Sequence, residues 1–498
     1  MPETPMKKLY SQFEANFTKY ALAAVLLAIP LYPKFPFIFV PGTYVAIRLE
    51  DFLIAAILLF WIVTQVVHRK LKLPGGVIGK GILLYFAVGL LSTLSAIFVT
   101  HTVVPHIGLL HFLRRIEYMA LFFVAASYLK EEKGIKFYIE AILWVIVCVL
   151  LYGLGQMYLN YPVISTQNEE FSKGVALHLT PGARLSSTFA GHYDLSAYLV
   201  IVMPLLVCMW TTKTEKWLRF AGLLGFVGGF WLLMMSASRI SFPAYLVSIT
   251  VTLILIKQKR WILPIGLVSV LLMATTTELA SRYLRTADVY LSQLSKIIQS
   301  PRKSPVEPPY QLAISPTPEP EEIITLPITN TTPLVKVTPI PTPTKRIKRK
   351  PKSTPTPYIP PVIIEERSTE IRLQASWPRA IRAFKKNPIL GTGYSSITLA
   401  TDNDYLRLIG ETGVLGTAAF LLIFVAIFFK SIKLLKEPTN SEKRIFGMGI
   451  IGSIIGILLN ASFIDVLEAS KVAIPFWIWA GFLAALIEIK RTTHEKNI

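Results

Sequence analysis

Cysteine and charged residues are both scarce in this chain of 498 residues. Charged residues make up 16% of it and hydrophobic residues 53%. The two cysteines, Cys148 and Cys208, both fall inside long apolar segments, which argues against a disulfide and favours small packing residues. The sequence has no Walker A loop, no HExxH, no GxSxG and no zinc-type Cys/His spacing. A built-in ATPase is therefore excluded.

Long apolar runs are what the sequence has instead. They measure about 18 to 25 residues, enough for each to cross a ~30 Å hydrocarbon core as a helix. The first run has no small-residue cleavage site and others follow at once, so it is expected to be retained. We predict an all-α polytopic membrane protein with about twelve transmembrane helices and one large extracytoplasmic loop. The helices are expected near residues 18–32, 50–67, 77–98, 104–129, 135–158, 189–210, 217–235, 240–256, 261–277, 406–429, 446–463 and 472–488.

The net charge is +21, but the positive residues lie mainly in the connectors between the apolar segments. This distribution does not indicate nucleic-acid binding. Alternate short connectors hold nearly all the Lys and Arg, for example Lys130 to Lys136, Lys257 to Arg260 and Lys430 to Arg444. Basic connectors are retained on the cytoplasmic side of membranes. The pattern predicts an inner-membrane protein with both termini in the cytoplasm and contact with anionic lipids.

The chain divides by hydropathy into three parts. Residues 1–277 hold the first nine helices, 278–405 form the large extracytoplasmic loop, and 406–498 hold the last three helices and a cytoplasmic tail. Residues 300–361 of the loop are rich in Pro and Thr. Such a stretch buries too little apolar surface to fold, so a disordered insertion is predicted.

An amphipathic helix is expected after the insertion, beginning at Pro378, which suits a first helical position. Ile381 would lie on one side, while Arg379 and Arg382 point towards the other. Such a helix can lie at the membrane surface with its cations towards headgroups.

Arg239 stands in SASRISF at the outer start of the eighth predicted helix. A cation there faces the positive end of the helix dipole, which is unfavourable unless an anion binds. Ser236, Ser238 and the free backbone N–H groups would complete an anion site. The alternative, which the sequence leaves open, is an interfacial Arg paired with a lipid phosphate or with Asp465.

Arg184 opens the segment ARLSSTFAGHYDLSAYLV. Ser186, Ser187 or Thr188 is expected to cap the sixth helix, which would put His192 in its first turns near the outer interface. His192 could accept a proton there. An interfacial hydrogen-bonding role is the other interpretation.

A third polar cluster, TDNDYLRLIGETGVLG, enters the tenth predicted helix. If that helix begins near Asp404, then Asp404, Arg407 and Glu411 share one face, and Arg407 can pair with either acid. Helix capping would account for Asp402. It does not account for Glu411, about two turns further in, where an ionisable residue indicates function.

Two further charged groups remain ambiguous. Arg114, Arg115 and Glu117 fall in the middle of the fourth helix, where a charge costs at least ~2.5 kcal/mol. They fit either an internal ion pair or a headgroup channel. Glu50 and Asp51 open the second helix, where acids suit the helix dipole, with a metal site as the alternative.

From about Arg184 to Leu415, apart from the insertion, the chain resembles the O-antigen ligase/polymerase superfamily. The features that match are RLSSTF before a helix, an SR pair opening a later one, and a loop ending in W-x-R, NPILGTGY and NDYLRLIGETGVLG. The superfamily also includes oligosaccharyltransferases that glycosylate pilins. The resemblance implies transfer or polymerisation of glycan from a polyprenyl-diphosphate-linked donor to a hydroxyl of a glycan, lipid or protein acceptor. No nucleotide, cofactor or obligatory metal is implied.

The resemblance also implies roles for residues, since neutralising the leaving diphosphate is the electrostatic work of this reaction. Ligase-type members carry a His, their proposed base, where this sequence has Asp402. An Asp can still accept a proton, and the substitution favours a polymerase or an uncharacterised branch. The expected diphosphate-binding residues are Arg184, Arg239, Arg379 and Arg382, and the expected catalytic residues are Asp402, Glu411 and His192.

The alternative function is a transporter or flippase of the same lipid-linked oligosaccharide, using Arg114, Arg115 and Glu117. Transporters usually show two related halves, and none is found here. The charged groups also gather at one face of the membrane, where chemistry rather than passage would occur. The sequence therefore favours the glycosyltransferase.

Overall fold

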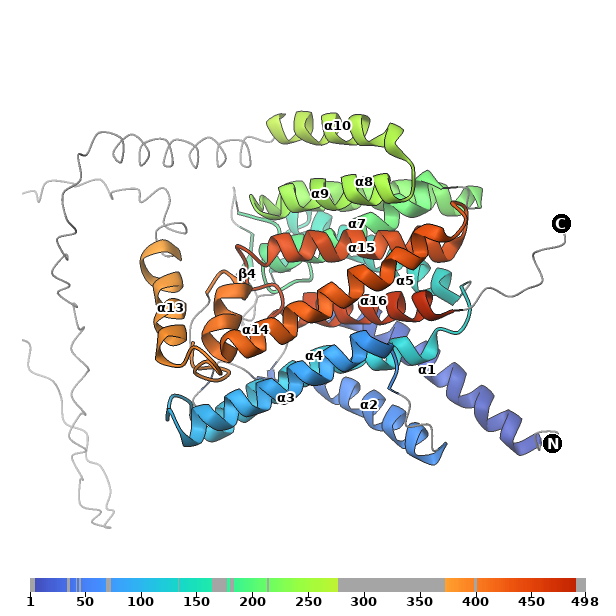
Figure 1. The fold of residues 1–498 in the computed structure, drawn as a ribbon. Helices are drawn as coiled ribbons and strands as arrows, with labels where there is room; N and C mark the ends of the chain where they lie inside the picture. The colour runs from blue at the N-terminus through green and yellow to red at the C-terminus, as the bar shows by residue number, and fades with distance from the viewer. Residues whose placement is uncertain are drawn as a thin grey trace, which may run out of the picture. The chain divides into compact units, whose positions relative to one another are not determined.

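The computed structural model consists mainly of long α-helices (Figure 1). It describes residues 5–33, 36–41, 43, 46–68, 73–132, 134–163, 177–179, 183–212, 215–275, 372–397 and 401–489, so the predicted insertion at 300–361 lies outside them. The helices in chain order are α1 (Pro5–Leu31), α2 (Leu49–Val67), α3 (Gly76–Phe98), α4 (Pro105–Tyr128), α5 (Gly134–Tyr158), α7 (His192–Thr211), α8 (Lys216–Ser236), α9 (Ser241–Leu255), α10 (Ile262–Thr275), α13 (Trp377–Lys386), α14 (Asp404–Ser431), α15 (Glu442–Asn460) and α16 (Ser470–Glu488).

Short strands and turns join these helices. The strand β1 (Pro36–Phe39) pairs antiparallel with β2 (Ala46–Arg48), and β3 (Pro162–Val163) with β4 (Leu177–His178). Turns of 3₁₀-helix occupy Lys259–Trp261 and Ile432–Lys436, and a π-helical turn at Arg372–Ser376 precedes α13.

Each of the twelve expected hydrophobic segments coincides with a helix. The capping prediction for the sixth segment is wrong, because the hydroxyls of Ser187 and Thr188 donate to backbone carbonyls of α5 and α1 instead. The helix consequently begins only at His192, with Gly191 at its N-cap position and no side chain capping it.

Seven of the described helices are long and apolar enough to cross a membrane: α2, α3, α5, α7, α8, α14 with the 3₁₀ turn that follows it, and α16. Large apolar side chains on outward faces, such as Trp144 at 68% exposed and Phe429 at 70%, suit contact with lipid. These features are those of a multi-pass membrane protein. The total of twelve spans stays a prediction.

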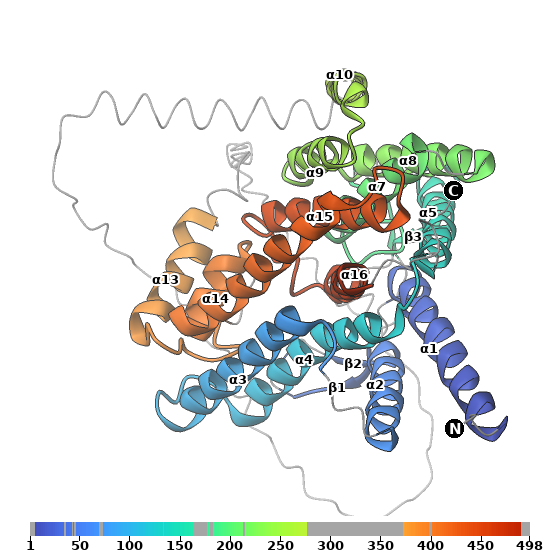
Figure 2. The ribbon, with the colours of Figure 1, turned by 45° about the vertical axis from the view of Figure 1, so that its right-hand side comes forward.

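The helix α16 lies in the middle of the helical bundle, where Figure 2 shows it nearly end-on. It is apolar on all sides and almost entirely buried, as a helix without a lipid-facing side must be. It packs chiefly against α4, while α14 packs on α3 and α15 packs on α7 and α9.

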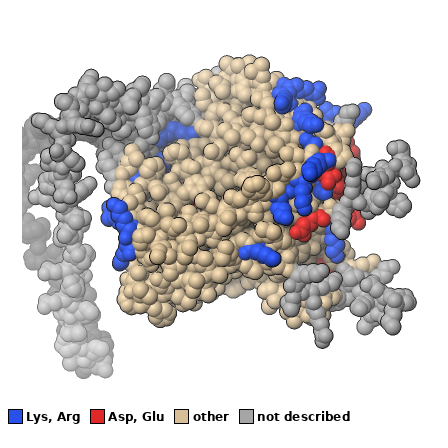
Figure 3. Space-filling model, in the orientation of Figure 1, with Lys and Arg blue, Asp and Glu red and all other residues tan. Residues whose placement is uncertain are grey.

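The basic connectors gather at one end of these helices, on the right in Figure 3. There Lys136 Nζ lies 2.7 Å from Glu442 Oε1, and Arg444 donates to the carbonyl oxygens of Leu435 and Leu255. A smaller group of cations lies at the opposite end, over α13. The alternation in the sequence thus corresponds to the two ends of one bundle; which end faces the cytoplasm stays a prediction.

A break interrupts α14 at Gly413, which has φ 64° and ψ −167°. The segment before α14 supplies the hydrogen bonds that the helix loses there. Gly393 N–H donates to Glu411 O at 2.8 Å, and Pro388 O accepts from Val414 N–H at 2.9 Å. Irregular backbone within an apolar region requires such partners. The first half of α14 is thereby fixed against the loop that follows α13.

Candidate functional site

Asp402 immediately precedes α14 but does not cap it. The N-cap is Asn403, whose Oδ1 accepts from Leu406 N–H at 2.9 Å. Asp402 has a left-handed backbone with φ 53°, and its Oδ2 accepts from Arg372 Nε at 3.1 Å. Its side chain is 34% exposed. The capping interpretation of Asp402 is therefore replaced by a carboxylate held by an Arg and open to solvent.

Arg372 was not identified from the sequence. It lies in the π-helical turn before α13 and is buried. The helix α13 packs on the first half of α14, with Gly410 close to the backbone of Ala380, and this brings the turn to the start of α14. The only signal in the sequence is an Arg shortly before the predicted helix, in STEIRLQASW.

Asp465 lies in the connector 461–469 between α15 and α16, and it accepts hydrogen bonds from the residues on both sides of Asp402. Its Oδ2 accepts from Thr401 N–H at 2.8 Å and its Oδ1 from Asn403 N–H at 2.9 Å. Arg407 Nη2 lies 3.4 Å from Oδ2. Burial raises the pKa of Asp465, and Arg407 and the two N–H groups oppose this only in part.

The same connector ties α4 and α14 together. Arg115 is ion-paired with Glu468 and also donates to Leu467 O at 3.2 Å, while Leu467 N–H donates to Asp404 Oδ2 at 3.0 Å. Burial alone would raise the pKa of Glu468. The positive charges of Arg115 and Arg407 outweigh it, so the pKa of Glu468 lies below its ordinary value.

Arg114, Asp51 and Glu50 form internal pairs as well. Arg114 Nη2 lies 3.1 Å from Asp51 Oδ2, which also accepts from Arg48 N–H, and Glu50 lies 3.5 Å from Arg48. Within the described residues no group of three or more His, Cys, Asp and Glu is placed to hold a metal ion. Of the two interpretations of the charges on α4, the geometry fits the internal ion pairs.

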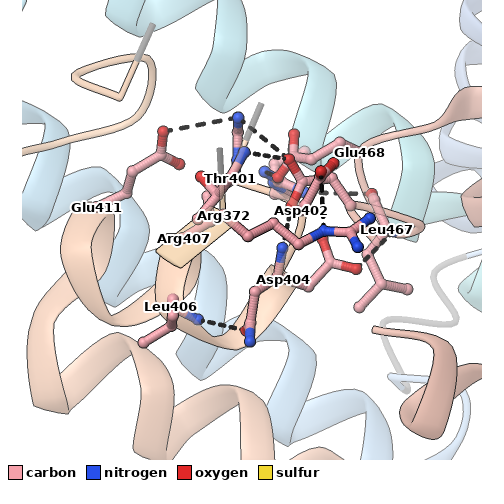
Figure 4. A network of polar contacts seen from close by, with 12 residues as sticks. Arg372, Thr401, Asp402, Asp404, Leu406, Arg407, Glu411, Leu467 and Glu468 are labelled. Carbon is pink, nitrogen blue, oxygen red and sulfur yellow. Dashed lines mark hydrogen bonds and ion pairs between the residues drawn. The ribbon is translucent and has the colours of Figure 1, made fainter. Parts of the chain in front are cut away.

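Glu411 lines a narrow buried cavity and is only 2% exposed. Arg407 Nη1 lies 4.0 Å from its Oε1, which makes no hydrogen bond to the described residues. The cavity measures about 20 Å³, enough for one water molecule, and Arg115 and Glu468 lie on its other walls. Glu411 and Asp402 are thus linked through Arg407 and Asp465. Figure 4 shows Glu411 apart from Asp402.

Arg184 and His192 contact each other, with Arg184 Nη1 2.7 Å from His192 Nε2. A guanidinium can only donate, so this ring nitrogen accepts and the proton of a neutral imidazole is on Nδ1. The contact occupies the nitrogen that a general base would use. In this arrangement His192 orients Arg184.

Lys471, at the start of α16, anchors the segment that carries Arg184. Its side chain is completely buried, and its Nζ donates to Thr188 O at 2.6 Å and to Pro30 O at 3.2 Å. The segment before α7 is therefore joined directly to the start of α16, which follows the connector that contains Asp465.

The other expected cations lie at the same end of the helices. Arg239 is half-buried between α8 and α9, and Ser241 at the start of α9 donates to Asn460 Oδ1 at the end of α15. Arg379 is half-buried and Arg382 exposed on α13, and within the described part of the chain neither makes a hydrogen bond or ion pair. The four cations thus come from three separate segments at one end of the bundle (Figure 1).

Comparison with known protein families gives a match to part of the chain. No curated protein matches the chain. Residues 224–421, from α8 into α14, match the family model of O-antigen ligase. The match includes Arg239, Asp402 and Glu411, and Arg184 and His192 precede it. This match and the apolar helices support the resemblance of the chain to the O-antigen ligase/polymerase superfamily.

Proposed function

We propose that this protein transfers or polymerises glycan from a polyprenyl-diphosphate-linked donor onto an acceptor hydroxyl. The observation that carries the proposal is Asp402. Because Asn403 caps α14, the carboxylate of Asp402 does not have to. Arg372 orients this carboxylate. It is partly exposed at the end of the bundle that also holds the four cations. A carboxylate beside a cationic surface suits an acceptor hydroxyl and a diphosphate leaving group.

The reaction requires one proton transfer and one charge neutralisation. The acceptor oxygen forms a bond to the anomeric carbon, the bond from that carbon to the diphosphate oxygen breaks, and Asp402 takes the hydroxyl proton. The electron pair leaves with the diphosphate, where fixed cations stabilise it. Among the described residues Oδ1 of Asp402 makes no hydrogen bond, which leaves it open to the acceptor.

Arg184, Arg239, Arg379 and Arg382 supply the positive charge in this proposal. Guanidinium groups suit it because they bind phosphate oxygens in a bidentate manner. Within the described residues Arg379 and Arg382 make no hydrogen bond or ion pair. His192 orients Arg184 by accepting a hydrogen bond from it. Glu411 supports the site through Arg407, instead of contacting the acceptor.

The proposed sidedness rests on the charge distribution. If the end with the basic connectors faces the cytoplasm, as basic connectors generally do, the site end faces outside. Residues 278–405 then form the large extracytoplasmic loop and both termini are cytoplasmic. An Asp at position 402, where ligase-type members carry His, favours chain polymerisation over ligation.

The transport alternative would use Arg114, Arg115 and Glu117. The two arginines are engaged by Asp51 and Glu468, so no observation favours a passage through α4.

Asp402→Asn tests the proposal, because Asn keeps the shape of the side chain but cannot take a proton. We expect the rate of glycan extension by purified protein on lipid-linked oligosaccharide to fall about 10²–10⁴-fold, measured on glycan gels. Glu131→Gln, an exposed acid at the opposite end, is the control and should be unchanged. Normal product from Asp402→Asn would overturn the proposal, as would movement of labelled donor across vesicles without new glycosidic bonds.

A further inference from the structure

A distant carboxylate binds the backbone on both sides of Asp402. Asp465 accepts the N–H of the residue before Asp402 on one oxygen and the N–H of the residue after it on the other, at 2.8 and 2.9 Å. Its side chain is 12% exposed. Sixty-two or more positions separate the partners along the chain, so this contact is a product of the fold.

This contact coincides with an unfavourable backbone conformation. Asp402 has φ 53°, in the left-handed region that residues with a Cβ adopt much less readily than glycine. The N–H of Asn403 belongs to the peptide that follows Asp402, and the N–H of Thr401 to the peptide that precedes Thr401. Two hydrogen bonds to one carboxylate therefore restrain the backbone on both sides of Asp402 and oppose its relaxation to an ordinary φ. Hydrogen bonds to a charged acceptor are the strong ones among protein hydrogen bonds.

Other groups account for the helix start and for the Asp402 side chain. Asn403 caps α14, and Arg372 binds the carboxylate of Asp402. The backbone between them is fixed by Asp465, whose charge is opposed by Arg407 at 3.4 Å. Each interaction thus restrains a different part of the same short segment.

We propose that Asp465 is a positioning residue that holds Asp402, the base of the proposed function, in its working conformation through the N–H groups of Thr401 and Asn403. The inference rests on the proposed function. It differs from a merely structural role because Asp465 acts through Asp402, so its effect on the rate requires the Asp402 carboxylate.

Asp465→Asn is the primary variant. The amide retains one acceptor oxygen but presents an NH₂ to the other N–H, and the ion pair with Arg407 is lost. We expect kcat to fall at least 10-fold while KM for the lipid-linked donor changes less than 2-fold, because the cations that bind diphosphate are untouched. Asp465→Glu, which keeps both acceptor oxygens, should recover part of kcat.

A double-mutant cycle separates positioning from folding. In the Asp402→Asn background, with its residual turnover measured, Asp465→Asn should cause no further loss of kcat. Glu468→Gln is the matched control: it removes a charge from the same connector but contacts Arg115 instead of residues 401–403, so its effect should be equal in both backgrounds. If Asp465→Asn is not recovered folded, the same cycle is run with Asp465→Glu.

Equal losses from Asp465 substitution in both backgrounds, or an unchanged kcat in Asp465→Asn, would overturn this inference alone. Normal activity in Asp402→Asn would instead overturn the proposed function. The two failures are therefore distinguishable.

Discussion

The two ends of the helical bundle both carry many charges but use them differently. At the site end, Asp465 and Arg407 are largely buried, and both of them and the half-buried Glu468 contact defined partners. At the basic end, Lys257, Lys259 and Arg260 are exposed. Exposed pairs are worth about 0–1 kcal/mol, whereas removing one partner of a buried pair costs several kcal/mol.

Burial, not the sign of the charge, makes this difference. Lys443 and Arg444 lie at the basic end but are only 5% exposed, and Arg444 donates to three backbone carbonyls. They resemble the residues of the site end in this respect. The comparison therefore predicts that substitutions are severe where side chains are buried and specifically bound, and mild where charges only mark the orientation of the protein.

The largest effect is expected from Gly413→Ala at the break in α14. Its φ of 64° and ψ of −167° fall in a region that is essentially restricted to glycine, and a Cβ would lie 2.3 Å from Ile389 O. Strain of about 1–3 kcal/mol adds to a clash with backbone that cannot move aside. We expect little folded protein in the membrane and no glycan product, measured by solubilised yield and by gel.

Gly266→Ala is the control for this substitution. Gly266 lies in α10 with no atom within 4 Å of a Cβ added there, and alanine favours helix more than glycine does. Yield and activity should be unchanged or slightly higher. A normal yield from Gly413→Ala would show that the break in α14 is dispensable.

Arg115→Leu should have the next largest effect. It leaves Glu468, whose side chain is 25% exposed, without its main cation. The free energy of unfolding should fall by more than the about 0–1 kcal/mol of an exposed pair but by less than the about 3–5 kcal/mol of a fully buried one. Thermal unfolding in detergent should show the loss. Arg115→Leu with Glu468→Leu should recover most of it, because no unpaired charge then remains.

The pH dependence of unfolding gives a second measure of this pair. The folded pKa of Glu468 lies below its ordinary value of 4.5, so the stability it contributes is present above that value and is lost as the pH falls through the folded pKa. The double variant should lose less stability than the wild type on acidification. An equal loss in both would contradict the role given to Glu468.

The helices were largely predictable from the sequence, but the contacts that make the site were not. Apolar runs and basic connectors are local features, and α14 begins at Asp404 as the pattern predicts. The contacts of Arg372 with Asp402 and of Asp465 with residues 401 and 403 join segments about 30 and 60 positions apart. Periodicity carries no information on such pairs. The glycines of the GETG segment are also compatible with an unbroken helix that another helix approaches closely, so the sequence does not predict the break at Gly413.

The smallest effect is expected from Lys136→Gln at the basic end. Lys136 Nζ lies 2.7 Å from Glu442 Oε1, but the two side chains are 29% and 23% exposed, and water screens such a pair. The substitution should change the free energy of unfolding by less than about 1 kcal/mol and leave glycan synthesis intact. Membrane orientation should also persist, since neighbouring connectors keep their positive charge. An effect as large as that of Arg115→Leu would mean that burial does not decide how much an ion pair at either end contributes to the free energy of unfolding.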